Sequence, residues 1–210
     1  MRIRILPREH GAYAQLGVPL VVALAAGRPG VAAFAFALGA IALFFVHEPL
    51  LSLAAELGAR ARSTARAARR LEHSLAGELV LSSLLAGAAV PAAMAAGVAS
   101  ELALWMWAAW ATGFGVVTCA VHGAVARRAR HGRDHVRAAR VLGPALAVTA
   151  GILVAFRPVP VVGVIPLVVA AVGIFVARPS ARRLRRVGWT LMTATLVAGV
   201  WMVIATRAAG

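Results

Sequence analysis

Long apolar stretches fill nearly the whole chain and restrict its fold more than any other feature. A hydropathy window of about 19 residues predicts helices at residues 11–27, 31–50, 75–96, 102–125, 141–156, 159–177 and 188–206. Such segments cross the bilayer as helices because a helix satisfies all of its own backbone hydrogen bonds in hydrocarbon. The pattern predicts an all-α fold, a polytopic transmembrane helical bundle of about seven spans.

The composition agrees with this prediction. Of the 210 residues, 61% are hydrophobic, whereas soluble domains are about 45–50% apolar. Only short breaks separate the apolar stretches, so we expect residues 1–210 to form a single integral membrane domain. The basic residues before the first stretch are typical of a signal peptide, but further spans follow, and we interpret residues 11–27 as a retained first helix.

The positions of the basic residues predict the orientation of the spans. All 22 are arginine, and all but Arg28, Arg157 and Arg207 precede the first apolar stretch or lie in the connections after the second, fourth and sixth stretches. With seven spans, the arginine-rich segments share one side of the membrane, and the positive-inside rule makes that side cytoplasmic. We therefore expect a multi-pass membrane protein with a cytoplasmic N-terminus.

The net charge of +15 is also found in proteins that bind nucleic acid. Here the arginines lie beside membrane spans, where topology and anionic lipid headgroups are sufficient to explain them. We therefore expect a bilayer with anionic headgroups as the partner, and no nucleic acid. The chain has no Gly-rich phosphate loop, HExxH motif, Ser-His-Asp order or paired CxxC, so the sequence assigns no catalytic residue, cofactor or metal.

Most of the tryptophans lie near predicted helix ends. Trp105, Trp107 and Trp110 follow the predicted outer turn at Glu101, and Trp201 nears the outer end of the last stretch. Aromatic rings gather where a bilayer meets water, so we expect an aromatic belt rather than a ligand-stacking site.

Four of the seven acidic residues stand next to a histidine, each pair at a different predicted helix end. The pairs are Glu9–His10, His47–Glu48, Glu72–His73 and Asp134–His135. The predicted topology assigns all four to the cytoplasmic face. One interpretation is that polar residues collect at helix ends because the bilayer centre excludes them. The other is a functional cluster formed by several helix ends.

Two ionisable residues lie deeper. Glu78 is about one turn inside the third predicted span, and Ser74, Glu78 and Ser82 form an i, i+4 stripe on one helical face. A carboxylate at that depth needs a partner or a proton.

On the fourth predicted span, a strip of small and polar residues leads to a histidine. The strip consists of Thr112, Gly115, Cys119 and His122. It is either part of a site or a packing face that ends in a histidine. Cys119, the single cysteine, can form no intrachain disulfide, and we interpret it as a small core residue.

The segment HGRDH places His131 and His135 four residues apart, a spacing that suits a divalent metal on a helix. Gly132 disfavours a regular helix and the neighbouring arginines repel a cation, so a solvated or phosphate-facing loop is favoured. Arginine suits phosphate and carboxylate groups. The candidate polar cluster consists of Glu9, His10, His47, Glu48, Glu72, His73, Glu78 and His122, and the candidate anion-binding residues are Arg8, Arg70, Arg133 and Arg137.

The segment PREHGAYAQLGVPL resembles the first-helix signature of the YwiC-like family of bacterial membrane proteins. The matching residues are Pro7, His10, Gly11, Ala12 and Tyr13, with Pro19 further into the helix. The rest of the likeness is a pattern of several spans over most of the chain. This resemblance implies a location in the bacterial inner membrane and supplies no reaction.

A weaker, fold-level likeness is to the UbiA-type intramembrane prenyltransferases, which carry polar chemistry on cytoplasmic connections. Those enzymes hold magnesium and a diphosphate with aspartate-rich motifs. Here the connection after the second span has no aspartate and the next has only Asp134. The likeness is therefore an analogy, and magnesium-diphosphate transfer by the usual ligands is not expected.

Three hypotheses of function remain open, and whether the protein is an enzyme is undecided among them. The first is a His, Glu and Arg pocket at the cytoplasmic face for an anionic or lipid-linked ligand. The second is a proton-coupled transporter or permease in which Glu78 and His122 relay protons. The third is a non-catalytic membrane assembly factor whose basic loops dock a partner.

Overall fold

Helices make up all the regular structure in the described part of the chain. The computed structural model describes residues 10–54, 63, 64, 67, 74–126, 133–156, 162–177 and 184–209. The elements are α1 (His10–Ala26), α2 (Val31–Ala54), α4 (Leu75–Gly87), α5 (Ala89–Ala95), α6 (Ser100–Ala126), α7 (Arg133–Phe156), the 3₁₀ helix η1 (Val162–Val164), α9 (Ile165–Ala177) and α10 (Leu184–Ala209). Five predicted stretches each overlap one helix, while α4 and α5 share the third and η1 and α9 share the sixth. The all-α prediction is confirmed for the described residues.

Several of these helices have the length and composition of membrane spans. Leu75–Ala95, Ser100–Ala124, Ala138–Phe156 and Arg185–Ala208 are long and apolar enough to cross a bilayer, while Gly11–Ala26, Val31–His47 and Val162–Ala177 are shorter apolar helices. The chain is therefore a multi-pass helical membrane protein. The count of seven spans and their orientation stay predictions.

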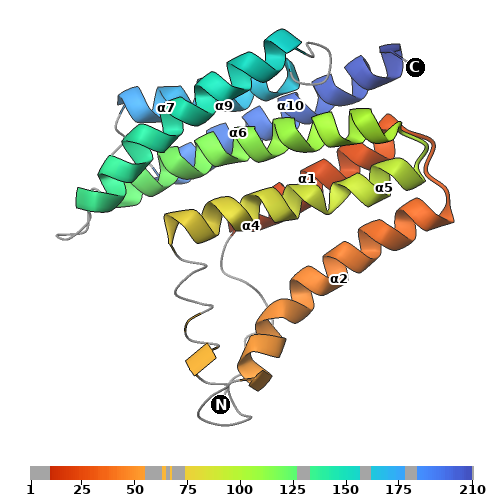
Figure 1. The fold of residues 1–210 in the computed structure, drawn as a ribbon, viewed down its shortest axis with the longest axis horizontal. Helices are drawn as coiled ribbons and strands as arrows, with labels where there is room; N and C mark the ends of the chain where they lie inside the picture. Colours follow the sequence, from red (N-terminus) through yellow and green to blue (C-terminus); the bar gives the residue numbers. More distant parts are fainter. Residues whose placement is uncertain are drawn as a thin grey trace.

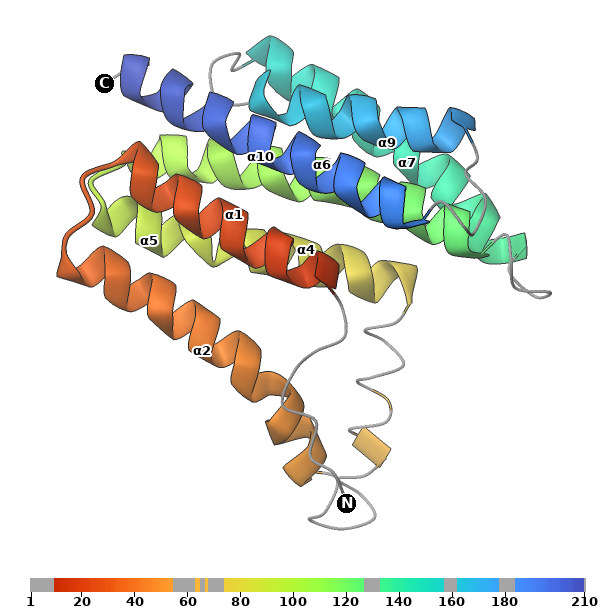
Figure 2. The same ribbon diagram turned by 180° about the vertical axis from the view of Figure 1, so that it is seen from behind.

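The helices are arranged around α6, and one of them stands apart. Helix α6 packs against α4, α7 and α9, while α1 packs against α10 and α5 (Figures 1 and 2). Helix α2 contacts α5 and, to a smaller extent, α1. It then diverges from α4, so that its C-terminal half points away from the bundle (Figure 1).

Glycines allow the neighbours of α6 to approach closely. A Cβ atom added at Gly113 would lie 2.5 Å from Cγ2 of Val164, and one added at Gly115 would lie 3.0 Å from Cδ1 of Leu146. Small residues at a helix interface bring backbones together, and packing rather than hydrophobicity drives association in lipid. Of the residues in the apolar window of α6, 61% are buried, against 17% for the window in α7.

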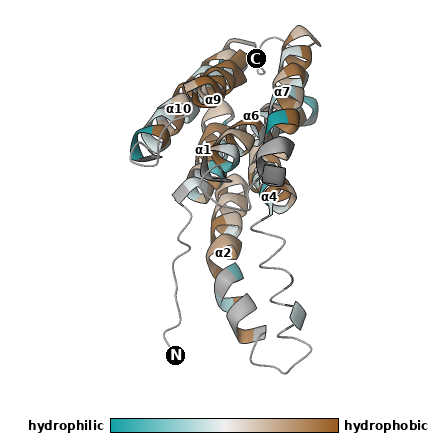
Figure 3. Ribbon diagram, turned by 90° about the vertical axis from the view of Figure 1, so that its left-hand side faces the viewer, coloured by the Kyte–Doolittle hydropathy of each residue, from teal (hydrophilic) through white to brown (hydrophobic). Residues whose placement is uncertain are grey.

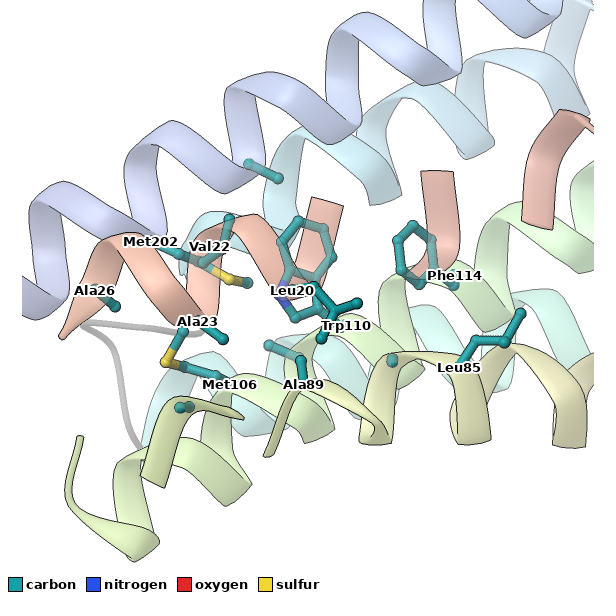
Figure 4. Packing of buried hydrophobic residues seen from close by; sticks show 14 of the residues in the cluster. Leu20, Val22, Ala23, Ala26, Leu85, Ala89, Met106, Trp110, Phe114 and Met202 are labelled. Atoms are coloured by element: carbon teal, nitrogen blue, oxygen red, sulfur yellow. The ribbon is translucent and has the colours of Figure 1, made fainter. Parts of the chain in front are cut away.

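The core between α1, α6 and α10 contains a large aromatic side chain. Trp110 is almost completely buried and stacks on Phe114, with ring centroids 5.2 Å apart and planes inclined by 18°. Leu20 and Met202 belong to the same cluster (Figure 4). The Trp110 indole Nε1 is buried without a hydrogen-bond partner. The aromatic-belt expectation is therefore wrong for Trp110, which lies in the core.

Proline explains the interruption between α4 and α5. Helix α4 ends at Gly87 and α5 begins at Ala89, two residues before Pro91. Proline lacks the N–H that would bond to the carbonyl four residues earlier, here that of Gly87, and its ring crowds that carbonyl. The third predicted stretch is thus two helical pieces rather than one continuous helix.

At one end of the bundle, tight turns are fixed to one another. The Arg28 backbone N–H donates to the Ala96 carbonyl at 2.7 Å, and the Arg207 Nε–H donates to the Ala25 carbonyl at 2.8 Å. The turn after α5 includes Gly97, whose φ of 85° is one that favours glycine. We call this end of the molecule the tight-turn end.

The other end collects the helix ends that the arginine-rich segments of the sequence connect. The starts of α1, α4, α7 and α10 and the ends of α6 and α9 lie there (Figure 2), and we call it the arginine-rich end. Figure 3 looks onto this end and shows hydrophilic colour where α10 begins, with largely hydrophobic colour along α9 and α10. Which side of a membrane either end faces stays a prediction.

Candidate functional site

An acid–histidine contact joins α4 to α6 near the arginine-rich end. Oε2 of Glu78, in the first turn of α4, lies 3.2 Å from Nδ1 of His122 in α6. A hydrogen bond between these atoms needs one proton, either on Nδ1 facing a carboxylate or on the carboxyl group facing a bare Nδ1. The side chain of His122 is 14% exposed and that of Glu78 is 36% exposed. The carboxyl group is therefore the more accessible member of the pair.

A second polar contact lies one helical turn further into the bundle. Oγ of Ser82 in α4 is 3.3 Å from Oγ1 of Thr118 in α6, and both side chains are buried. Helices α4 and α6 run antiparallel, so Glu78 opposite His122 and Ser82 opposite Thr118 form two successive rungs. The two helices thus bury a continuous polar strip where they face each other.

A third helix, α1, contributes a side chain to this strip. Oε1 of Gln15 lies 3.2 Å from Oγ of Ser82, which also donates to the Glu78 carbonyl at 2.7 Å. Ser82 has one hydroxyl hydrogen, so it donates to one of these acceptors at a time, while Thr118 can donate to Ser82. We call Gln15, Glu78, Ser82, Thr118 and His122 the polar seam.

Local sequence explains why these side chains are placed here. Ser74 caps α4, because its hydroxyl accepts a hydrogen bond from the Gly77 N–H at 3.0 Å, and this cap fixes where the helix starts. In α1, Pro19 has no N–H to donate to the Gln15 carbonyl one turn earlier. Gln15 therefore brings both an amide side chain and a carbonyl without its helical donor to the middle of α1.

The strip predicted on α6 divides into two parts. Gly115 and Cys119 face other helices: Gly115 lies against Leu146 of α7, and Cys119 is fully buried in a cluster with Leu75 and Ala139. Thr112 donates to the Ala108 carbonyl of its own helix at 2.7 Å. The packing-face interpretation thus fits these three residues, while His122 faces α4.

The structure locates α2 relative to the start of α1. The Tyr13 ring lies 5.4 Å from that of Phe44 and 6.0 Å from that of Phe45. Because the two helices are antiparallel, His10, the first residue of α1, is level with His47 and Glu48 along α2. His47 is exposed, and α2 packs on α5 and α1 rather than on α4 and α6, so His47 is not brought to the Glu78–His122 pair.

Some of the remaining predicted site residues lie outside the described part of the chain, and for the others only the backbone is described. Convergence of the four adjacent acid–histidine pairs therefore stays a prediction, as does anion binding by the arginines. The residues not described are Arg8, Glu9, Arg70, Glu72, His73 and His131, and those whose side chains are not described are His10, Glu48, Arg133, Asp134, His135 and Arg137.

No metal-binding group is formed by the described residues. Within them, no three side chains of histidine, cysteine, aspartate or glutamate come together in a way that could hold an ion. The chemistry that the described polar seam offers is proton sharing and hydrogen bonding.

Sequence reasoning missed Gln15 and Thr118. The signal for Gln15 was a lone amide about one turn into an apolar stretch, since polar side chains inside spans usually have a partner or a role. The signal for Thr118 was its position four residues before His122, which places both on one helical face.

Residues 6–76 match the YwiC-like protein family. The matched region contains α1, with Gln15, and α2, and it ends two residues before Glu78, so four of the five residues of the polar seam lie beyond it. No curated protein and no solved structure matches the chain. The resemblance seen in PREHGAYAQLGVPL is thus confirmed for the first part of the chain.

Proposed function

We propose that this YwiC-like membrane protein binds an anionic or lipid-linked ligand at its arginine-rich end. The observation that carries the proposal is the polar seam. Side chains from three helices meet there, around an acid–histidine pair 3.2 Å apart. Ionisable side chains inside apolar helices are expensive and are retained mainly where a site needs them.

The charges on Glu78 and His122 depend on where the protons of the pair lie, so they can change when a ligand binds. The 3.2 Å contact fits three protonation states: an imidazolium facing a carboxylate, a neutral imidazole that donates Nδ1–H to a carboxylate, and a protonated acid that donates to a bare Nδ1. An anionic group favours the charged imidazole. Arg8, Arg70, Arg133 and Arg137 would supply further cations from the arginine-rich segments.

The membrane arrangement is part of the same proposal. The arginine-rich end faces the cytoplasm of a bacterial inner membrane, with seven spans and anionic headgroups around it. Its support is that all but three of the 22 arginines precede the first apolar stretch or lie between the second and third, fourth and fifth, or sixth and seventh stretches, as the positive-inside rule requires. Nucleic acid has no place in this arrangement.

The test measures binding of a defined anionic amphiphile to the purified full-length protein in mild detergent. The probe is hexadecyl phosphate, compared with uncharged hexadecanol. We expect His122→Gln to weaken binding of the phosphate roughly tenfold and to leave hexadecanol unaffected, because the lost interaction is with the charge. His47→Gln is the matched control and should bind as wild type, since α2 does not pack on α4 or α6.

Equal affinity of the wild-type protein for phosphate and alcohol would overturn the proposal. So would unchanged phosphate binding by His122→Gln. If His47→Gln and His122→Gln lost phosphate binding to the same extent, the assignment of the anion site to the polar seam would also be contradicted.

A proton-coupled transporter is the second candidate, and one observation favours it. The hydroxyls of Ser82 and Thr118 lie 3.3 Å apart, one helical turn inward of the Glu78–His122 pair, and Ser82 bonds to the backbone carbonyl of Glu78 rather than to its carboxyl group. Polar side chains that follow an ionisable pair into a bundle are found along proton relays. Its test is proton flux into proteoliposomes, which Glu78→Gln should abolish and Glu101→Gln should leave intact. Absence of any flux from wild-type protein would remove this candidate. The assembly-factor hypothesis stays a prediction, without a specific observation in its favour.

A further inference from the structure

A wholly apolar groove lies beside the polar seam, between α2 and the α4–α5 pair. Its volume is about 650 Å³, and its lining includes Leu16 of α1, Phe36, Gly39 and Phe44 of α2, Leu85 of α4 and Pro91 of α5. None of the side chains that line it is polar. The volume falls within the roughly 300–1,000 Å³ of small-molecule sites.

The divergence of α2 creates this space. Helix α2 packs on α5 and then leaves α4, so that the two helices separate toward the arginine-rich end (Figure 1). Among the residues that the structure describes, none has an atom within 4 Å of a Cβ added at Gly39, in the part of α2 that lines the groove. The groove is therefore open space within the membrane-spanning part of the molecule.

The lining and the size of the groove favour a hydrocarbon chain as its occupant. A polar ligand would lose its hydrogen bonds to water and gain none from these walls. An α-helix is about 10–12 Å across with its side chains, much thicker than a single hydrocarbon chain, so a helix would place only one of its faces against the groove. A single lipid chain has no hydrogen bonds to lose, and it is thin enough to enter such a groove from the side.

The groove adjoins the polar seam through two helices. Leu16 follows Gln15 in α1, and Leu85 lies three residues after Ser82 in α4. Gln15 and Ser82 are within hydrogen-bonding distance of each other, at 3.2 Å. One wall of the groove is thus continuous with the site proposed for an anionic group.

Aromatic rings mark the end of the groove nearest the arginine-rich end. Phe44 lines the groove, and its ring lies 5.4 Å from that of Tyr13 and 5.7 Å from that of Phe45. Tyrosine prefers the boundary between hydrocarbon and headgroups, where its ring is apolar and its hydroxyl is wet. The rings thus mark the end of the groove toward which a chain's headgroup would point, the same end as the polar seam.

We propose that this groove binds the hydrocarbon chain of an anionic amphiphile whose headgroup interacts with the Glu78–His122 end. The inference rests on the proposed function for the identity of the headgroup. It adds the binding site of the chain and makes the ligand an amphiphile rather than a free anion.

The test uses hexadecyl phosphate that carries a diazirine at the end of its chain, bound to the full-length protein and activated by light. In wild-type protein we expect labelling concentrated in residues 32–43 and 84–91. Gly39→Phe should reduce that labelling roughly tenfold by filling the groove. Gly151→Phe in α7 is the matched control, because a Cβ atom at Gly151 also meets nothing within 4 Å, and its labelling should equal that of wild type. Ala35→Leu is a second variant of the lining, should Gly39→Phe fail to fold.

Each other outcome decides against the inference. Labelling spread equally over α7, α9 and α10, or unchanged labelling in both lining variants, would overturn it. A change in the oligomeric state of Gly39→Phe without a change in labelling would assign the groove to a second copy of the chain. The two proposals fail separately. If wild-type protein is labelled equally by diazirine-bearing hexadecanol and hexadecyl phosphate, the groove binds a chain but the anion site is wrong. If His122→Gln weakens phosphate binding but Gly39→Phe leaves labelling unchanged, the anion site holds and the groove assignment is wrong.

Discussion

Helices α6 and α2 are both long and apolar, yet their surroundings differ completely. Helix α6 has 27 residues and α2 has 24. Within the apolar window of α6, 61% of residues are buried, whereas most large side chains of α2 are exposed. The exposed large side chains of α2 are those of Val31, Phe34, Phe36, Leu38, Ile41, Leu43, Val46, Leu50 and Leu53.

This difference shows that apolar character makes a segment a membrane helix but does not determine which other helices it packs against. Lipid tails are as apolar as leucine, so a helix gains little by exchanging lipid for another apolar helix. Close packing and hydrogen bonds decide instead. In α6, glycines fit against Val164 and Leu146 and polar groups pair with α4. Gly39 of α2 has no such neighbour within 4 Å.

The largest effect that tests this comparison concerns an aromatic residue in each helix. Trp110→Ala should lower the free energy of unfolding by about 3–5 kcal/mol, because it leaves a cavity in the core. Phe34→Ala, at a position 49% exposed, should change it by less than about 0.5 kcal/mol, because lipid replaces the ring. SDS titration of the protein in mild detergent measures both. Similar losses in the two variants would show that α2 is packed as tightly as α6.

Glycine substitutions give the next largest contrast. Gly113→Ala should destabilise the protein by about 1–3 kcal/mol, because the new Cβ atom would lie 2.5 Å from Cγ2 of Val164. Gly39→Ala should be neutral or stabilise by up to about 1 kcal/mol, since alanine is the better helix former. The same titration separates the two outcomes. Destabilisation by Gly39→Ala would mean that another molecule or helix approaches α2 there.

The coupling across the Glu78–His122 pair is smaller. A double-mutant cycle of Glu78→Ala and His122→Ala should give an interaction energy of about 1 kcal/mol, typical of a hydrogen bond between partly exposed charged groups. A cycle of Glu78→Ala with His47→Ala in α2 should give none, because α2 does not pack on α4. Additive effects in the first cycle would show that the 3.2 Å contact contributes nothing to stability.

The smallest effect concerns the hydroxyl groups of the polar seam. Ser82→Ala should cost about 0.6 kcal/mol, the average for a hydrogen bond between membrane helices. Thr149→Ala is the control, because its hydroxyl donates to the Ala145 carbonyl of its own helix at 3.0 Å, and it should change stability by only a few tenths of a kcal/mol. If the two substitutions were indistinguishable, Ser82 would not hold α4 to α6.

Hydropathy was sufficient to predict the helices, because the apolar runs are long and polar residues separate them. Residues 102–125 and 188–206 were predicted where α6 covers Ser100–Ala126 and α10 covers Leu184–Ala209. The interruption at Ala88 was not predicted, although Pro91 indicates it. The central place of α6 was not predictable either, because it depends on which surfaces fit together across the chain.

The site was predictable only in part of its membership, since Gln15 and Thr118 were missed, and its contacts were not predictable. Glu78 and His122 were each singled out, on separate stripes, yet their contact joins residues 44 positions apart and depends on the register of α4 against α6. The four adjacent acid–histidine pairs attracted attention because they are neighbours in sequence. In a helix, however, residues i and i+1 point in directions about 100° apart and do not face each other.

Trp110 shows how depth decides between two roles for one residue type. It lies ten residues after the start of α6 at Ser100, which at 1.5 Å per residue is about 15 Å into the helix. That distance is beyond an interfacial belt and within the core. Trp107, nearer the start, has its indole N–H bonded to the Ser83 carbonyl at 3.0 Å.

The contact between α1 and α10 has a consequence for synthesis of the protein. Arg207 bonds to the Ala25 carbonyl across 182 residues, and an added Cβ atom at Gly199 would lie 3.0 Å from Val22. At roughly 5–20 residues per second, the ribosome needs about 10–40 s to make the intervening chain. During that interval the α10-facing side of α1 is covered by lipid or by the insertion machinery, and the bundle closes only when α10 arrives.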